Sequence, residues 1–188
     1  MRQLATPFHR LIGFLIDTFL PLLPFLFLLA WIFSTPDVST LLDRVLWVIV
    51  IDTFGSLAIT FLNSFLISKF GGTLGKLLTG IKIVRGDGSN IGYLRAIFRG
   101  TIGYSASAMV ALTGFWWMLI NKERRTWHDL LSDTYVVISG KIGIVLGVVI
   151  LGVLIGLNIF AGKKVIQNFQ RNQATYQNFV QNLNINNP

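Results

Sequence analysis

Apolar and polar residues fall into long blocks along this chain rather than into short alternating periods. Two apolar runs, about residues 11–33 and 45–67, are each long enough to cross a membrane core of about 30 Å as a helix. The polar stretch between them, residues 34–44, is rich in Ser, Thr, Pro and Asp, which favour turns and helix caps. The pattern therefore predicts a hairpin of two transmembrane helices.

The middle of the chain is basic and shows a strand pattern. Residues 69–99 contain six basic residues and a single acidic one. Residues 80–85 alternate and are rich in β-branched residues, as are residues 134–138, so we expect a small two-stranded element. Residues 91–98 predict an amphipathic helix in the membrane interface. Basic loops stay on the cytoplasmic side, which places this element and the N-terminus in the cytoplasm, beneath the cell membrane.

A third apolar run, about residues 101–120, is open to two interpretations. It is just long enough to span the membrane, but Gly114 interrupts it and a re-entrant turn there is equally consistent with its length. Counting basic residues on each side does not decide between them. Two isolated strands can pair only on one side of the membrane, which favours re-entry.

The last third of the chain divides into an apolar helix and a polar tail. Residues 139–162 contain the next transmembrane helix, and residues 163–188 form an Asn- and Gln-rich amphipathic tail, leaving 1–138 as the main membrane domain. Two small-residue faces, Gly143 with Gly147 and Gly152 with Gly156, could dock neighbouring helices or a second copy of the chain. Alternatively, glycine is simply common in membrane helices.

Composition narrows the function classes. The chain is 53% hydrophobic and 13% charged, with a net charge of +8. The positive charge lies between apolar runs, which favours the bilayer and its anionic lipid headgroups over nucleic acid as partners. With no cysteine and only two histidines, a metal site is not expected. We identify no nucleophile–base pair, so we expect neither an enzyme nor a cofactor.

An aspartate inside an apolar run is costly and is a candidate functional residue. Asp17 lies in the first run, and Arg10, seven residues earlier, projects from nearly the same helix face. Rise per residue places Asn63, with Thr60 and Ser64, at a similar depth in the second run. Asp17 is then either a proton- or cation-binding carboxylate or a polar clasp that fixes helix register. Arg10 either anchors to lipid phosphate or reaches Asp17.

Two further aspartates and a basic group complete the candidate set. Asp52 lies toward the opposite end of the second run, as an outer ion site or a solvated residue near the headgroups. Asp129 follows His128, and either caps a short helix with Arg99 or Arg125 as its partner or takes part in a metal or proton site. Five basic residues are candidates for lipid or partner contact: Lys76, Lys82, Arg85, Arg95 and Arg99.

These motifs, in this order, resemble the RDD family of small prokaryotic membrane proteins over about residues 7–138. The resemblance rests on Arg10 with Asp17, Thr73-Leu-Gly-Lys76, Gly80-Ile-Lys-Ile-Val84, Asp87-Gly88, Arg99, Arg125-Thr-Trp-His-Asp129 and Thr134-Tyr-Val-Val. It implies that Arg10, Asp17 and Asp129 are important, and that transport, including sodium/proton antiport in some members, is a candidate activity. Asp133 departs from the family, which usually has a small residue there.

The sequence thus predicts an α-helical integral membrane protein with three or four transmembrane helices. We expect a component of ion, proton or small-solute transport that uses Asp17, with a cation or proton as its ligand. The alternative is a membrane scaffold whose basic cytoplasmic loop binds a partner protein or anionic lipid.

Overall fold

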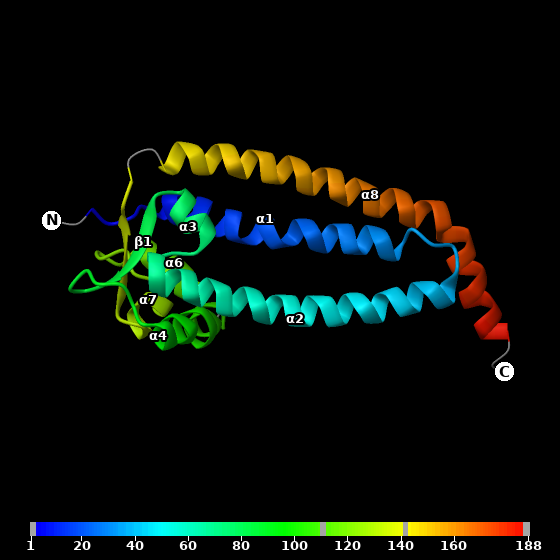
Figure 1. The fold of residues 1–188 in the computed structure, drawn as a ribbon, viewed down its shortest axis with the longest axis horizontal. Helices are drawn as coiled ribbons and strands as arrows, with labels where there is room; N and C mark the ends of the chain where they lie inside the picture. The colour runs from blue at the N-terminus through cyan, green and yellow to red at the C-terminus, as the bar shows by residue number, and fades with distance from the viewer. Residues whose placement is uncertain (1–2, 110–111, 141–142, 186–188) are drawn as a thin grey trace. The chain divides into compact units, whose positions relative to one another are not determined.

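The computed structural model describes residues 3–109, 112–140 and 143–185. Within this part, three helices are long and apolar enough to cross a membrane: α1 (Pro7–Ile32), α2 (Val38–Phe70) and α8 (Gly143–Ile185) (Figure 1). The chain is therefore a multi-pass membrane protein by length and composition, and the two helices of the predicted hairpin are both present.

Helix α2 begins at Val38, earlier than the predicted start near residue 45, because Asp37 caps it. The Asp37 carboxylate accepts hydrogen bonds from the backbone N–H of Thr40 at 2.8 Å and from its hydroxyl at 2.6 Å. Hydrogen bonds from the Thr40 and Ser39 side chains lower the pKa of Asp37 from 3.8 to about 2. An N-cap of this kind satisfies donors that the first helical turn leaves free.

The chain forms two compact units, and the three long helices pass through both. The first unit holds Met1–Thr18 and Leu57–Gly152, and the second holds Phe19–Ser56 and Val153–Pro188. The short elements α3 (Leu74–Leu78), α4 (Tyr93–Phe98) and α7 (Trp127–Leu131) belong to the first unit, where they gather beside the two strands (Figure 1).

The predicted two-stranded element is confirmed. Strands β1 (Ile81–Arg85) and β2 (Thr134–Ile138) pair antiparallel, with Ile81 opposite Ile138. A segment that the pattern did not predict, residues 3–5, adds to β2: Ala5 donates its backbone N–H to the Val136 carbonyl at 2.9 Å. The apolar core of the unit lies at these strands and comprises Ala5, Ile67, Ile81, Ile83, Ile91, Ala96 and Val136.

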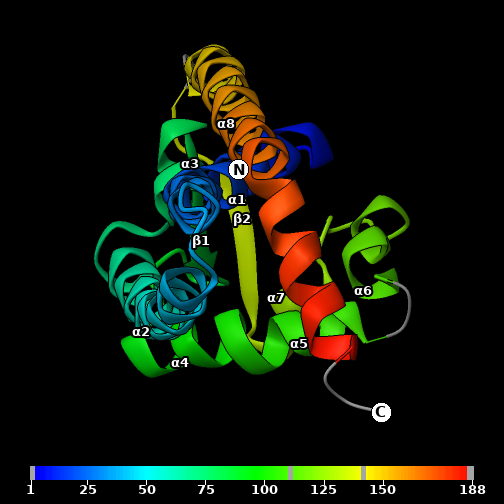
Figure 2. The same cartoon turned by 90° about the vertical axis from the view of Figure 1, so that its right-hand side faces the viewer.

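The third apolar run is broken rather than straight. Helix α4 passes through a π-helical turn (Arg99–Gly103) into α5 (Tyr104–Ala108), and Figure 2 shows α4 and α5 along one helical run. Helix α6 (Thr113–Trp116) and a 3-10 turn (Trp117–Leu119) follow, and the two arms are bent by 105°. Residues 110–111 of the predicted 101–120 segment lie outside the described residues. The short helix expected at 91–98 is present as α4, and its place in the interface stays a prediction.

Gly143 and Gly147 bring α8 into close contact with the connection between α3 and β1. A Cβ at Gly143 would lie 2.4 Å from the Gly80 nitrogen, and one at Gly147 would lie 2.5 Å from the Thr79 methyl carbon. This small-residue face therefore packs against the connection between α3 and β1 of the same chain, and docking of a second copy stays a prediction. At Gly152 and Gly156, by contrast, a Cβ would meet no described atom within 4 Å.

In the second unit the Asn-rich segment continues α8 as one helix to Ile185 (Figure 1). Its polar side chains donate to carbonyl oxygens at the end of α1: Asn168 to Ala30 at 2.7 Å, Asn172 to Phe33 at 2.9 Å and Tyr176 to Thr35 at 2.5 Å. Ala30 belongs to the last turn of α1, whose carbonyls lack intrahelical partners, and Phe33 and Thr35 follow the end of the helix at Ile32. The spacing of four residues puts all three donors on one helix face.

We predict that Gly143→Ala destabilises the protein by about 1–3 kcal/mol, because the added methyl group would overlap the backbone of Gly80. Gly152→Ala is the matched control, since it adds the same group to the same helix in open space. Unfolding of the purified protein in mixed detergent micelles measures the difference. Equal stability of the two variants would contradict the close packing.

Candidate functional site

Asp129 lies at the centre of a buried ion cluster in the first unit. Its side chain has no exposed surface, and its carboxylate accepts from Arg10 Nη1 at 2.5 Å and from Arg99 Nη2 at 2.6 Å. It also accepts from the backbone N–H of Thr126 at 3.1 Å and from the Thr126 hydroxyl at 2.8 Å, which caps α7. The expectation of a helix cap with Arg99 as partner is confirmed.

The two arginines decide the charge state of Asp129. Burial by itself would raise the pKa of this carboxyl, but the charges of Arg99 and Arg10 outweigh it and hold the pKa well below 3.8. Asp129 is therefore ionised at any physiological pH. An ionised carboxylate that is buried with two guanidinium partners is a structural element, since losing it would leave both charges uncompensated.

His128 lies next to this cluster in a closed pocket of hydroxyl and aromatic groups. Its ring nitrogens lie 3.0 Å from the Ser107 hydroxyl and 2.9 Å from the Thr126 hydroxyl, and its ring stacks on Tyr104 with centroids 4.3 Å apart. Burial, followed by the positive charge of Arg99, lowers the pKa of His128 well below 6.5. The imidazole is therefore neutral at neutral pH.

Asp17 forms a second and more open cluster. Its carboxylate accepts hydrogen bonds from the Thr73 hydroxyl, from the Gly75 backbone N–H at 2.8 Å and from Lys76 Nζ at 3.0 Å. A Cβ at Gly75 would lie 2.2 Å from the carbonyl oxygen of Gly13 on α1, so only glycine allows α3 to approach this closely. The segment Thr73-Leu-Gly-Lys76, at the start of α3, thus supplies the groups that bind the Asp17 carboxylate.

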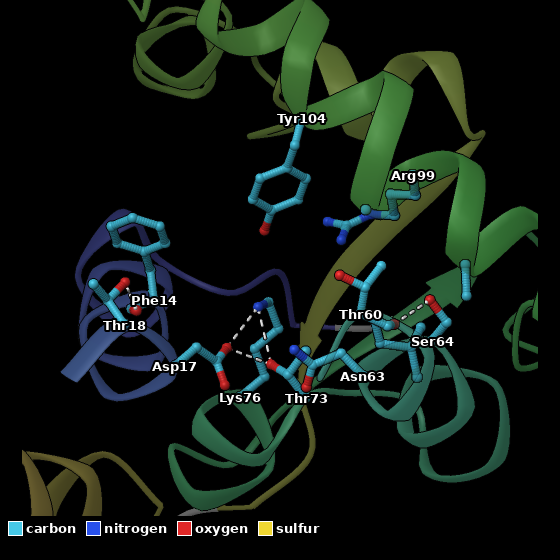
Figure 3. Close-up of a pocket in the computed structure, with 13 residues that line it drawn as sticks. Phe14, Asp17, Thr18, Thr60, Asn63, Ser64, Thr73, Lys76, Arg99 and Tyr104 are labelled. Carbon is cyan, nitrogen blue, oxygen red and sulfur yellow. Dashed lines mark hydrogen bonds and ion pairs between the residues drawn. The ribbon is translucent and has the colours of Figure 1, made fainter. Parts of the chain in front are cut away.

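A cavity of about 200 Å³ opens beside Asp17, and Figure 3 shows the side chains around it. Helix α1 contributes Asp17 and the short α3 contributes Lys76, while Arg99 and Tyr104 come from the bent helical run. Five of the remaining lining residues carry hydroxyl or amide groups, namely Thr18, Thr60, Asn63, Ser64 and Thr73. The other four do not: Phe14, Ile67, Ala96 and Gly100.

The partners of Arg10 and Asp17 in the structure differ from those predicted. Arg10 binds Asp129 and not Asp17, so the two residues on one helix face serve different clusters. Asn63 lines the cavity with Asp17, but within the described residues the hydrogen bonds to Asp17 come from the α3 segment, which corrects the expected pairing across the hairpin. Asp52 is exposed on α2 and is not among the residues that line the cavity.

The basic candidates for lipid or partner contact divide by burial. Lys76 and Arg99 are buried and their charges are used inside the protein, against Asp17 and Asp129. Lys82 and Arg85 are exposed on β1, and Arg95 is half-buried on α4. In the described part of the chain no group of three or more His, Cys, Asp and Glu side chains could hold a metal ion.

Sequence reasoning missed several polar residues of the site. Thr73 and Gly75 belong to the motif Thr73-Leu-Gly-Lys76, but nothing in its spacing predicts that they bind Asp17. Ser107 and Tyr104, which hold His128, come from the weakly apolar half of the third run. Polar residues in such a run are a signal for contacts inside the protein, because lipid offers them no partners.

We predict that Asp129→Asn lowers the free energy of unfolding by about 3–5 kcal/mol, because it leaves the buried Arg10 and Arg99 without a counter-charge. Asp43→Asn, at an exposed position on α2, is the matched control and should change stability little. Chemical unfolding in detergent gives both values. A loss below about 1 kcal/mol for Asp129→Asn would place the cluster among weak surface pairs.

We predict that stability falls as the pH drops below about 6.5. The unfolded chain binds a proton on His128 near that pH, whereas the folded chain resists it, so acid favours unfolding. His128→Gln should reduce this pH dependence. Thermal unfolding between about pH 5 and pH 8 measures the slope. Identical slopes for wild type and His128→Gln would refute this origin.

Comparison with known proteins gives the family of the chain. The RDD family matches residues 4–133, which is more than half of the chain. The uncharacterized protein YckC of Bacillus subtilis (strain 168) is 31% identical over 84 residues. That alignment covers 42% of this chain and 56% of YckC, so it spans little more than half of the relative's length. No solved structure matches the chain. The match over residues 4–133 includes Arg10, Asp17 and Asp129, and the chain belongs to the RDD family.

Proposed function

We propose that this protein is a transport component that moves a small monovalent cation in exchange for a proton, with Asp17 as the binding carboxylate. The observation that carries the proposal is the Lys76–Asp17 ion pair, with Nζ 3.0 Å from the carboxylate, at the wall of a cavity that hydroxyl and amide groups help to line. Asp17 belongs to a membrane-length helix, where an ionisable residue facing a cavity marks an ion path.

The lining of the cavity suits a hard cation. Thr18, Thr60, Ser64 and Thr73 present hydroxyl oxygens, and Asn63 presents an amide oxygen, next to the carboxylate of Asp17. Oxygen ligands of this kind replace the hydration shell of hard metal ions. The position that a cation would take at Asp17 is held by the Lys76 ammonium, so the two compete for one carboxylate.

This competition couples the cation to a proton. When a cation binds Asp17, the Lys76 ammonium loses its partner in a poorly solvated site and releases a proton to the cavity. When the cation leaves, Lys76 takes a proton again and restores the ion pair. One positive charge enters as the other leaves, so the net charge of the site stays constant through the cycle.

The strand pairing supports a particular topology for this transport component. We propose that the N-terminus and both strands lie on the cytoplasmic side of the cell membrane, because residues 3–5 pair with β2 and β2 pairs with β1. The run between the strands then has to return to the side it left, and the 105° bend between its arms favours a re-entrant segment. Helix α8 would carry the C-terminus to the opposite side.

We predict that Asp17→Asn abolishes cation-driven proton flux. Protein reconstituted in vesicles with an internal pH-sensitive dye should acidify or alkalinise the lumen when a sodium, potassium or lithium gradient is imposed, and Asp17→Asn should fall to the rate of protein-free vesicles. Asp52→Asn is the matched control, because Asp52 is an exposed aspartate on a membrane-length helix that does not line the cavity. It should retain wild-type flux.

The same variants test the structural alternative. If wild type and Asp17→Asn are equally silent with all three cations, and Asp17→Asn only loses stability in detergent, Asp17 is a clasp between α1 and α3 rather than an ion site.

A further inference from the structure

A second cavity lies on the other side of α4 and shares no lining residue with the Asp17 cavity. It measures about 300 Å³ and lies between α4 and the connection from α7 to β2. Its lining residues are Leu94, Arg95, Phe98, Leu131, Ser132 and Asp133.

This cavity presents a cation and an anion that do not neutralise each other. The side chain of Arg95 makes no hydrogen bond or ion pair with any other described residue, and its Nη1 is buried without a partner. Among the described residues, the Asp133 carboxylate has one long contact, with Arg125 Nη2 at 3.4 Å, and its side chain is 67% exposed. A buried guanidinium nitrogen without a partner is costly, so an anion at this position would stabilise the site.

The rim of the cavity is apolar and open. Leu94 is 80% exposed, Leu131 is 55% exposed and Phe98 is 37% exposed. Arg95 also stands in the first turns of the apolar helical run Tyr93–Ala108, the place where arginines extend to the headgroup level of a membrane. Exposed apolar side chains around a charged pair therefore meet lipid rather than water.

We propose that this cavity binds the headgroup of a phospholipid that carries a primary ammonium group, as phosphatidylethanolamine does. Arg95 takes the phosphate, Asp133 accepts hydrogen bonds from the ammonium, and Leu94, Phe98 and Leu131 contact the glycerol and acyl chains. A purely anionic headgroup fits less well, since Asp133 repels it. A quaternary ammonium carries no N–H to donate to Asp133.

The backbone at Asp133 supplies a clean test of its carboxylate. Its φ is +49°, in the left-handed region where glycine is unstrained, so Asp133→Gly removes the carboxylate without harm to the fold. Asp133→Asn keeps the size of the side chain and removes only the charge.

Lipid competition on the purified full-length protein tests the proposal. The protein in detergent is mixed with equal amounts of phosphatidylethanolamine, phosphatidylglycerol and phosphatidylcholine of identical acyl chains, and native mass spectrometry counts the retained lipids. We expect wild type to retain phosphatidylethanolamine about tenfold over the other two, the size of one charge-assisted hydrogen bond. Arg95→Gln should lose this retention. Asp133→Gly and Asp133→Asn should shift it toward phosphatidylglycerol.

Lys122→Gln is the matched control, because it removes one exposed positive charge away from the cavity and should behave as wild type. The proposal is overturned if wild type retains the three lipids equally, if Arg95→Gln retains as much phosphatidylethanolamine as wild type, or if the Asp133 variants keep the wild-type preference. Thermal unfolding of each variant excludes misfolding as the cause of a loss.

Discussion

The buried carboxylate of Asp129 is the constraint on which the first unit depends. It draws together α1 through Arg10, 119 residues away in the chain, and the π-helical turn through Arg99, 30 residues away. Burial of this charge costs solvation free energy, which two guanidinium groups and the N-terminus of α7 offset. Arg10 nevertheless has Nε and Nη2 buried without partners in the described part of the chain, so its guanidinium is held there through its Nη1 contact with Asp129.

Arg99 connects this structural cluster to the candidate ion site. Its guanidinium binds Asp129 at 2.6 Å, while the same residue lines the cavity beside Asp17. The two aspartates therefore differ in kind. Asp129 is fully enclosed and held by two arginines, whereas the Asp17 side chain is 16% exposed and held by one lysine, whose charge is easier to remove than that of an arginine. Of these two aspartates, Asp17 lines a cavity and Asp129 is fully buried.

The sequence predicted the elements better than the contacts between them. The length of the apolar runs predicted α1 and α2, and the alternation of side chains predicted β1 and β2. Both signals are local in the sequence. The capping role of Asp129 was also readable, since Thr126 precedes it by three residues. The partners of Asp17 were not, because rise per residue measures depth along α2 but says nothing of the start of α3, residues 73–76, which lies against α1. Arg10 and Asp129 are 119 residues apart in the chain, so no local sequence pattern predicts their contact.

The π-helical turn at Arg99–Gly103 explains how one short segment serves three neighbours. A regular helix repeats its faces every three to four residues, whereas a π turn adds a residue and changes which side chains follow on each face. Here Arg99 reaches Asp129, Tyr104 lines the cavity while stacking on His128, and a Cβ at Gly103 would lie only 3.0 Å from the Cβ of His128. The irregularity therefore lies where the ion cluster, the buried histidine and the cavity meet, and a straight third helix could not bring these three groups to one segment.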